Sequence, residues 1–387
     1  MKRSTDRILT THCGSLPRPK DLLDLMKAKI EGKPYDEDGY AGRTRSAVAQ
    51  SVREQAQDGI DVVTDGEQGK PGFFTYVTER LTGFQPRGSE HGPPPPFFPA
   101  EVSAFPEYYE QYFRQAMLGG SITANPNLVC TGPVRYRGQD AIQRDVANLK
   151  AALAGVTVEE VFVPSVAPSG IGRNLYYASE EEYLLAVAEA MRDEYQAIVE
   201  AGFILQLDDP WLSEIYSDPA LTPAERRGRA EAYAAAVNHG LRGIAPEKVR
   251  LHTCYGINEG PRVHDASLAD VLEVMLAVNA GAYSFEAANP RHEHEYHVWE
   301  QVKLPEGKLV IPGVITHASN IVEHPKLVAE RLVRYAERVG RENVIAGADC
   351  GFSSQASYNP EVHPTVIRAK FQALAEGAKL ATKQLWG

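Results

Sequence analysis

The sequence predicts an α/β fold, a (β/α)8 TIM barrel with a Pro/aromatic-rich excursion. Short β-type runs alternate with longer helical patterns, which indicates βαβ units and a parallel sheet. The chain has 387 residues, and barrels of this class run from roughly 200 to over 400 residues as one unit. The sequence contains no tandem repeat or low-complexity linker. We therefore expect residues 1–387 to form a single barrel domain.

Nine runs have the composition of strands, one more than the barrel needs. They are Ile8–Thr11, Asp61–Asp65, Leu128–Val134, Val161–Val166, Ile204–Asp208, Val249–Cys254, Ala282–Glu286, Leu309–Val314 and Val344–Ala348. We assign Leu128–Val134 to the excursion and the other eight runs to the barrel.

Helical patterns lie between most of these runs. Ser179–Glu200 opens with a serine cap followed by acidic residues and carries apolar residues at helical spacing. Pro223–Leu241, Leu268–Val278, Pro325–Val339 and Thr365–Leu380 have the same character. An open doubly wound sheet is the alternative fold. Against it, no G-x-G-x-x-G follows the first strand, and the sequence has no P-loop motif.

The segment 85–136 interrupts the alternation of strands and helices. It contains GPPPPFFPA, followed by the aromatic run FPEYYEQYF. A proline-rich segment of this length inside a compact domain is usually a functional loop. We expect a lid-like insertion within the barrel.

Composition excludes several classes of protein. Forty Lys and Arg against 51 Asp and Glu give a net charge of −11, which excludes a nonspecific binder of nucleic acid. No stretch approaches the roughly 18 apolar residues of a membrane span. The basic N-terminus lacks the apolar region of a signal peptide. Four cysteines in this length do not form a disulfide scaffold, so we expect a cytoplasmic protein whose thiols are free, buried or metal-bound.

Polar residues follow the predicted strands at the carboxyl ends, where barrels carry function. They are Cys13, Ser15, Asp65, Glu67, Asp208, Asp209, His252, Cys254, Glu286, His317, Asp349 and Cys350. Charged side chains are rarely buried unless they are paired or bind metal. These strand ends are therefore candidates for a binding or catalytic site.

Four of these residues have the chemistry of a zinc site. His252 and Cys254 are two apart in LHTC, so a strand points both to one face. Cys350 ends the run GADC, and Glu286 follows AYSF. An imidazole, two thiolates and a carboxylate suit tetrahedral zinc. The alternative is that the cysteines are small buried apolar residues.

Seven motifs carry a resemblance to a known family: TTHCGSLPRP, TDGE, LQLDDP, LHTCY, SFEAAN, PGVITHAS and GADCGF, in that order. With them, nearly the whole chain resembles the catalytic C-terminal barrel of cobalamin-independent methionine synthase. That family includes shorter stand-alone relatives such as epoxyalkane:coenzyme M transferases. The resemblance implies a Zn²⁺ cofactor with His252, Cys254, Glu286 and Cys350 as ligands. The interval from Cys254 to Glu286 is longer than in methionine synthases.

The resemblance also implies roles for residues around the metal. His317 matches a histidine that delivers a proton to the leaving group, which suits an imidazole near neutral pH. Ser15, Glu67 and Asp208 match positions that hold the carboxylate and ammonium of homocysteine, and two acids suit an ammonium.

Further residues are candidates for a donor or anion site. Asn174, Tyr176 and Tyr177 follow a strand where the family places its electrophile or methyl donor, although aromatic packing explains them as well. Arg18, with Lys70, is a candidate for binding an anion such as a sulfonate, and the alternative is a solvated surface charge. We expect the histidine-rich run 291–297 to be mostly exposed polar surface or bonding between loops.

The function that these features predict is zinc-dependent methyl transfer to a substrate thiol, with homocysteine as the expected thiol. A folate, a corrinoid protein or another methyl donor supplies the methyl group. The first alternative is an epoxyalkane:coenzyme M transferase, but Glu67 and Asp208 together would repel a sulfonate. The second is a non-catalytic zinc or thiol-binding barrel. The partners expected are small molecules, with no nucleic acid or membrane, and the sequence does not predict the oligomeric state.

Overall fold

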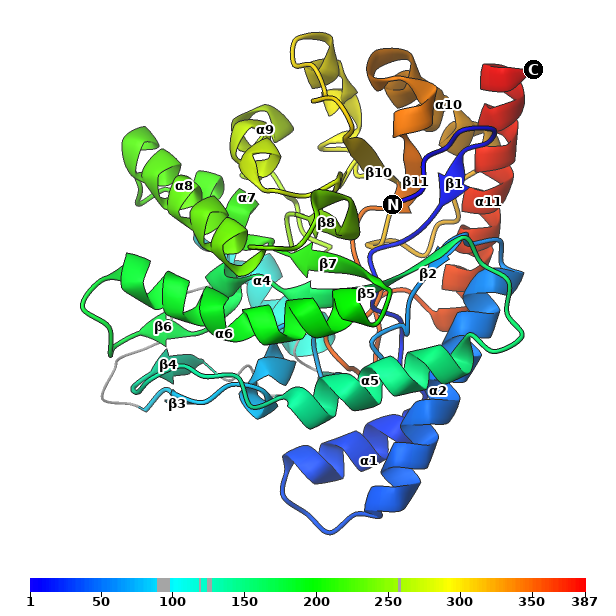
Figure 1. The fold of residues 1–387 in the computed structure, drawn as a ribbon. Helices are drawn as coiled ribbons and strands as arrows, with labels where there is room; N and C mark the ends of the chain where they lie inside the picture. Colours follow the sequence, from blue (N-terminus) through cyan, green and yellow to red (C-terminus); the bar gives the residue numbers. More distant parts are fainter. Residues whose placement is uncertain (89–97, 118–119, 124–126, 257–258) are drawn as a thin grey trace.

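Eight parallel strands form a nearly closed barrel. The computed structural model describes residues 1–88, 98–117, 120–123, 127–256 and 259–387. Neighbouring strands follow the order β1-β11-β10-β9-β8-β7-β5-β2. In chain order each barrel strand therefore lies beside the next, and the last pairs with the first. Helices surround the strands (Figure 1), and the predicted (β/α)8 barrel is confirmed.

The barrel strands are β1 (Leu9–Thr10), β2 (Val62–Val63), β5 (Glu160–Val166), β7 (Ile204–Asp208), β8 (Val249–His252), β9 (Ala282–Phe285), β10 (Leu309–Ile315) and β11 (Ile345–Ala348). The helices are α1 (Lys20–Ile30), α2 (Glu37–Gln57), α3 (Pro99–Ala104), α4 (Pro106–Tyr112), α5 (Gln139–Ala152), α6 (Glu180–Glu200), α7 (Trp211–Ser217), α8 (Pro223–Gly240), α9 (Leu268–Ala277), α10 (Pro325–Val339) and α11 (Pro364–Trp386). All eight barrel strands overlap the runs predicted for them.

Hydrogen bonds between β1 and β2 bring the two ends of the sheet together. The amide of Asp61 donates to the carbonyl of Thr10 over 3.1 Å, and the Thr11 hydroxyl donates to the carbonyl of Val62 over 3.0 Å. These bonds join the two strands that have no ladder between them. As a result, the carboxyl ends of all eight strands surround one mouth.

The helix caps follow the local sequence. The side chain of Ser179 accepts a hydrogen bond from the amide of Glu182, as the serine cap of α6 predicts. Thr222 and Glu225 form a capping box at the start of α8. Apolar residues of these helices pack on the strands, so the core lies between the barrel and its helices.

The insertion after β2 contributes two of the strands in a second, three-stranded sheet. β3 (Phe84–Pro86) pairs antiparallel with β4 (Leu128–Cys130), which pairs parallel with β6 (Arg173–Asn174). The run that began at Leu128 thus lies outside the barrel, as predicted. In Figure 1 this sheet lies to one side of the barrel. The proline run GPPPP of the insertion lies outside the described residues.

Contacts tie the insertion to loops at the barrel mouth. Glu101 of α3 accepts a hydrogen bond from the amide of His264, in the loop after β8, over 2.6 Å. The amide of Ile122 donates to the carbonyl of Ala356, in the loop after β11, over 3.0 Å. The insertion is therefore attached to two loops at the barrel mouth. None of the helices in the described part of the chain is both long and apolar enough to span a bilayer.

Candidate metal centre and substrate cavity

A cavity of about 660 Å³ opens at the carboxyl ends of the strands. Seven of the residues that line it come from strand ends that the sequence singled out: Cys13, Ser15, Glu67, Asp208, His252, Cys254 and Cys350. Another part of its wall is aromatic, with Phe73 stacked on Trp211 at 5.8 Å between ring centroids. Its volume is in the range of small-molecule sites in proteins.

An imidazole and two thiols meet at the bottom of this cavity. The candidate ligand atoms of His252, Cys254 and Cys350 all lie within 4.8 Å of one another. The sulfur atoms of Cys254 and Cys350 are 3.4 Å apart, and both cysteines are free. All three side chains are buried, with exposed fractions of 3–5%. One nitrogen and two soft sulfur ligands suit zinc.

The ring of His252 is held in one orientation by two neighbours. Its Nδ1 lies 3.1 Å from the hydroxyl of Ser284 and 3.6 Å from the sulfur of Cys13. The thiol of Cys13 donates to the carbonyl of Ala348 over 3.0 Å, so its sulfur is available as an acceptor. The buried Nε2 of His252 has no hydrogen-bond partner. Because Nδ1 is engaged, Nε2 is the nitrogen available to a metal ion.

A hydrogen bond joins the two facing thiols. Cys350 donates its S–H to the sulfur of Cys254, and this hydrogen bond, with His252 nearby, lowers the pKa of Cys254 to about 5. The same hydrogen bond, together with burial, raises the pKa of Cys350. Ionisation of Cys254 is thus favoured over that of Cys350, and a divalent cation would favour ionisation of both.

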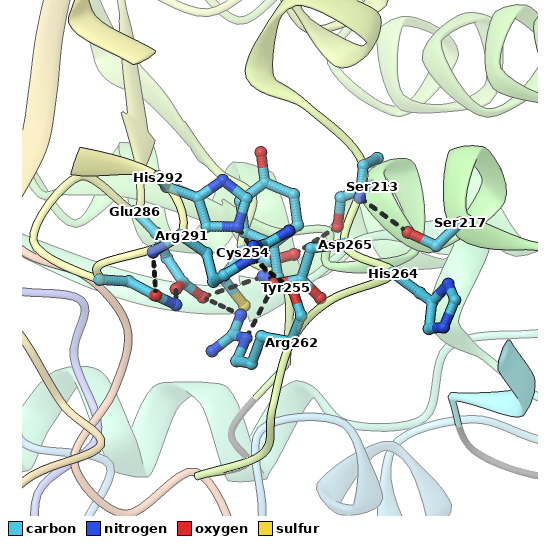
Figure 2. A network of polar contacts seen from close by, with 12 residues as sticks. Ser213, Ser217, Cys254, Tyr255, Arg262, His264, Asp265, Glu286, Arg291 and His292 are labelled. Carbon is cyan, nitrogen blue, oxygen red and sulfur yellow. Dashed lines mark hydrogen bonds and ion pairs between the residues drawn. The ribbon is translucent and has the colours of Figure 1, made fainter. Parts of the chain in front are cut away.

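The fourth residue of the expected ligand set, Glu286, follows β9 and is paired with Arg262 (Figure 2). Its Oε1 is 3.1 Å from Nη2 of Arg262, and it also accepts from the amide of Tyr255 over 3.0 Å. Its carboxylate is within 4.8 Å of His317 and Asp349 rather than belonging to the group formed by the imidazole and the thiols. Burial opposes ionisation of Glu286, but Arg262 and His317 lower its pKa to about 2. Glu286 is therefore an ion-paired carboxylate.

His317 and Asp349 lie next to Glu286 on the same side of the site. Burial lowers the pKa of His317 to about 4, although the nearby Glu286 opposes this shift. His317 is therefore neutral at pH 7 in this structure. The Oδ1 atom of Asp349 accepts hydrogen bonds from the amides of Ala287 and Ala288, both over 2.8 Å. Asp349 thus fixes the backbone that follows Glu286.

Ser15, Glu67 and Asp208 come together on the cavity wall, as the sequence predicted. The Glu67 Oε2 atom is buried without a hydrogen-bond partner, 3.7 Å from the nearest nitrogen of Arg18. Oδ1 of Asp208 accepts from Nε2 of Gln206 over 2.7 Å. Burial raises the pKa of Asp208 to about 7, and His252 opposes this shift. A cationic group bound here would favour the charged forms of both acids.

Arg18 and Lys70 are buried, which contradicts the alternative of solvated surface charges. Arg18 donates to the carbonyls of Leu16, Ser353 and Lys70. The Lys70 ammonium donates to the carbonyl of Pro164 over 2.6 Å. Neither side chain lines the cavity. Arg18 and Lys70, the candidates for binding an anion, are thus already paired with backbone carbonyls, and Arg18 is also paired with Glu67.

Asn174, Tyr176 and Tyr177 are not among the residues that line the cavity. Oδ1 of Asn174 accepts from the amides of Tyr176 and Tyr177, and its Nδ2 donates to the carbonyl of Tyr177 over 3.0 Å. The Tyr177 hydroxyl accepts from the amide of Val134 over 3.0 Å. Tyr176 is 51% exposed. The structure thus gives Asn174 and Tyr177 the role of ordering a turn beside the small sheet.

Comparison with known proteins connects this arrangement to one family. The family described as "Cobalamin-independent synthase, Catalytic domain" matches residues 169–368, slightly more than half of the chain. The chain belongs to this family. The matched segment includes the three cavity residues of the imidazole–thiol group and also Glu286 and His317.

Relatives and solved structures extend this cobalamin-independent synthase match over the rest of the chain. A methionine synthase of Sulfolobus acidocaldarius is 26% identical over 344 residues, 88% of this chain and 85% of the relative. One from Saccharolobus islandicus is 25% identical over 379 residues, 97% and 95% of the two chains. A B12-independent methionine synthase from Shewanella sp. W3-18-1, in complex with selenomethionine, has the same fold, with a TM-score of 0.70 at 19% identity over 98% of this chain and 99% of that one.

Two residues around the candidate site, Ser284 and Arg262, were missed in the sequence. Ser284 lies two positions before Glu286 on β9, and the two-residue period of the strand was a usable signal. Arg262 lies in the long interval between Cys254 and Glu286, whose length was the only signal. His292 is buried, stacks on Tyr255 at 3.9 Å between ring centroids and pairs with Asp265 in the loop after β8, which is the bonding between loops expected of this run, while His294 and His297 are exposed.

Proposed function

We propose that this protein transfers a methyl group to the sulfur of homocysteine at a zinc centre held by His252, Cys254 and Cys350. The observation that carries the proposal is the convergence of these three ligand atoms, within 4.8 Å of one another, in a cavity that Glu67 and Asp208 also line. The names of the relatives, methionine synthases, support the same reaction. Zinc bound there supplies a Lewis acid that keeps a substrate thiol ionised at neutral pH.

The polar wall of the cavity suits an amino-acid thiol. Glu67 and Asp208 present two carboxyl groups to the cavity, which favours an ammonium group and disfavours a sulfonate. The hydroxyl of Ser15, 3.4 Å from that of Ser354, is the donor we assign to the substrate carboxylate. Because Arg18 and Lys70 are already paired, they do not favour the alternative substrate, coenzyme M.

We assign the proton transfers to His317. Its ring is neutral at pH 7 because burial lowers its pKa to about 4. It must therefore take up a proton before it can donate one, and the substrate thiol, which loses a proton, is the source. Glu286 lies close enough to stabilise the imidazolium that forms. His317 then delivers this proton to the leaving group of the methyl donor.

The aromatic wall suits a donor that carries a flat ring system. Phe73 and Trp211 are stacked at an angle of 28°, and Phe74 meets Trp211 edge to face. Such faces bind planar ligands. We propose a methylated folate, or another small donor with a planar ring, rather than a corrinoid protein. Turnover with a methylfolate but not with a methylcorrinoid supports this choice, and the reverse pattern refutes it.

X-ray absorption at the zinc edge, with and without homocysteine, tests the proposed reaction at its first step. We expect two sulfur scatterers in the free protein and a third when homocysteine is added. The same measurement with coenzyme M should show no third sulfur. A third sulfur with coenzyme M but not with homocysteine would replace homocysteine by the alternative thiol. Zinc-loaded protein that binds homocysteine but methylates none of it with any donor would indicate the non-catalytic alternative.

A further inference from the structure

Arg18 is buried behind the cavity wall and joins three of the loops at the barrel mouth. Its Nη1 donates to the carbonyl of Leu16 over 3.2 Å and to the carbonyl of Ser353, and its Nη2 donates to the carbonyl of Lys70 over 2.9 Å. These three carbonyls belong to the loops after β1, β11 and β2, respectively. The side chain of Arg18 has no exposed surface. One side chain therefore connects three segments that lie beyond the ends of the strands.

Two of these loops carry residues of the polar cavity wall. Ser15 lies in the loop after β1 and Glu67 in the loop after β2, and both line the cavity. The amide of Leu16 donates to the carbonyl of Gly66 over 3.1 Å, so the two loops are also bonded to each other beside these residues. Arg18 itself does not line the cavity. It thus lies directly behind the part of the wall to which we assign the amino-acid group of the substrate.

The backbone of Glu67 has a conformation that requires support from its surroundings. Its φ is 55°, in the left-handed region that residues other than glycine rarely adopt, and Gly66 before it has a φ of 68°. The amide of Glu67 donates to Oδ1 of Asp65 over 2.8 Å, and its carbonyl accepts from the amide of Lys70 over 3.0 Å. The carbonyl of Lys70 is the one that Arg18 holds. Because strained residues persist only where neighbouring contacts fix them, Arg18 helps to fix the turn that brings Glu67 to the cavity.

Arg18 also places a positive charge behind Glu67 and leaves the carboxylate free to accept hydrogen bonds. Nη2 of Arg18 lies 3.7 Å from Oε2 of Glu67, which is beyond hydrogen-bond distance, and this buried oxygen has no partner among the described residues. Burial raises the pKa of Glu67, and Lys70 and Arg18 oppose this shift. The two cations thus favour the charged carboxylate, whose free oxygen is available to the N–H groups of a ligand.

We propose that Arg18 is a positioning residue for substrate recognition: by joining the three loops, it holds Glu67 where the free carboxylate oxygen receives the ammonium group of the substrate. Selection of an amino-acid thiol then depends on a residue that does not touch the substrate. This inference rests on the proposed function and deepens it, because it names a residue that determines which thiol the cavity selects.

The affinities of zinc-loaded variants for two thiols test this role. Homocysteine and 4-mercaptobutyrate differ only by the ammonium group, and calorimetry measures both dissociation constants. Arg18→Gln should weaken homocysteine binding by about tenfold and leave 4-mercaptobutyrate binding within about twofold of wild type. Arg80→Gln is the matched control, because Arg80 is buried, does not line the cavity, and is paired with Glu194 and Asp145. It should leave the ratio of the two affinities unchanged.

Substitution of Glu67 shows whether Arg18 acts through this carboxylate. Glu67→Gln should weaken homocysteine binding by roughly 10–100-fold, and adding Arg18→Gln should weaken it by no more than about twofold further. General loosening of the fold would not produce this non-additivity. Additive losses in the double variant, or equal weakening of both thiols in Arg18→Gln, would overturn the inference.

Arg18→Lys decides the question if Arg18→Gln does not fold. Lysine keeps the charge, but a single ammonium on a flexible stem does not span three carbonyls as the planar guanidinium does. We expect homocysteine binding about threefold weaker than in wild type and unchanged binding of 4-mercaptobutyrate. Wild-type affinity for homocysteine in this variant would rule out the positioning role. Failure of the proposed function is recognised separately, because Glu67→Gln would then bind homocysteine as tightly as wild type.

Discussion

The sulfur atoms of Cys254 and Cys350 lie 3.4 Å apart, although 96 positions separate the two residues in the sequence. Cys254 follows β8 and Cys350 follows β11, and the barrel brings the carboxyl ends of both strands to one mouth. His252, the last residue of β8, completes the group. This candidate metal-binding group is thus assembled by the fold rather than by a local motif.

Replacing Cys350 with serine should release the metal. A serine hydroxyl remains protonated at neutral pH and is a poor zinc ligand, so we expect a loss of affinity greater than the roughly 10–100-fold that follows removal of an outer-shell partner. Zinc content per chain, measured by elemental analysis after dialysis, checks this result. Cys130→Ser is the matched control, because Cys130 is buried in the small sheet and donates to the carbonyl of Gly132. Equal zinc content in the two variants would contradict the assignment.

Replacing His317 with asparagine should slow methyl transfer and leave the metal in place. Loss of a general acid–base group typically costs about 10²–10⁴ in rate. Single-turnover kinetics, with zinc content measured on the same samples, separates the two effects. His297→Asn, an exposed histidine, should retain the full rate. A variant at position 317 that transfers methyl groups as fast as wild type would remove His317 from the mechanism.

Replacing Asp208 with asparagine should weaken binding of homocysteine selectively. A hydrogen bond to a charged group contributes about 1.5–3 kcal/mol, so we expect KM to rise by roughly 10–100-fold. The comparison thiol is 4-mercaptobutyrate, which is homocysteine without its ammonium group and should lose little affinity. If both thiols are weakened equally, Asp208 does not recognise the ammonium.

Acid should destabilise the wild-type protein relative to a His12→Asn variant. The Nδ1 atom of His12 accepts from the amide of Gly14, and its Nε2 pairs with Gln55 over 2.8 Å, so the buried ring is neutral. Burial lowers the pKa of His12 from 6.5 to about 4. Between these pH values the unfolded chain binds the extra proton, and stability falls as pH falls. The free energy of unfolding of wild type should drop by on the order of 3 kcal/mol more than that of the variant.

Urea titrations of both proteins at pH 7 and pH 4 measure this difference. The comparison with the variant is needed because other buried groups titrate in the opposite sense. Burial raises the pKa of Asp209 to about 7, for example, which favours the folded state in acid. An unchanged difference between the two proteins across this range would show that the pKa of His12 is the same in the folded and unfolded states, which contradicts this prediction.

The barrel and much of the site were predictable because they follow from short-range patterns. Runs of β-branched and apolar residues located the eight strands, and the carboxyl ends of parallel strands must converge. That geometry alone brings Ser15, Glu67 and Asp208 to the cavity that holds His252. The assignment of Leu128 and its neighbours to the insertion followed from the break in the alternation.

Side-chain pairing in loops was not predictable from the same patterns. Arg262 and Glu286 are 24 residues apart, with α9 and β9 between them, and the periodicity of these two elements does not indicate that the two side chains meet. Arg18 is buried because three carbonyls face its guanidinium, a property of the folded backbone that composition does not encode. Asn174 orders its own turn rather than facing the cavity. An asparagine at this position is compatible with either role, so the sequence alone does not distinguish them.

The measurement that tests the central claim most directly is methyl transfer to homocysteine before and after exhaustive removal of metal. The protein should lose its activity when zinc is removed by a chelator and regain it in proportion to added zinc, up to about one ion per chain. A zinc-free preparation that methylates homocysteine at the full rate would contradict the account.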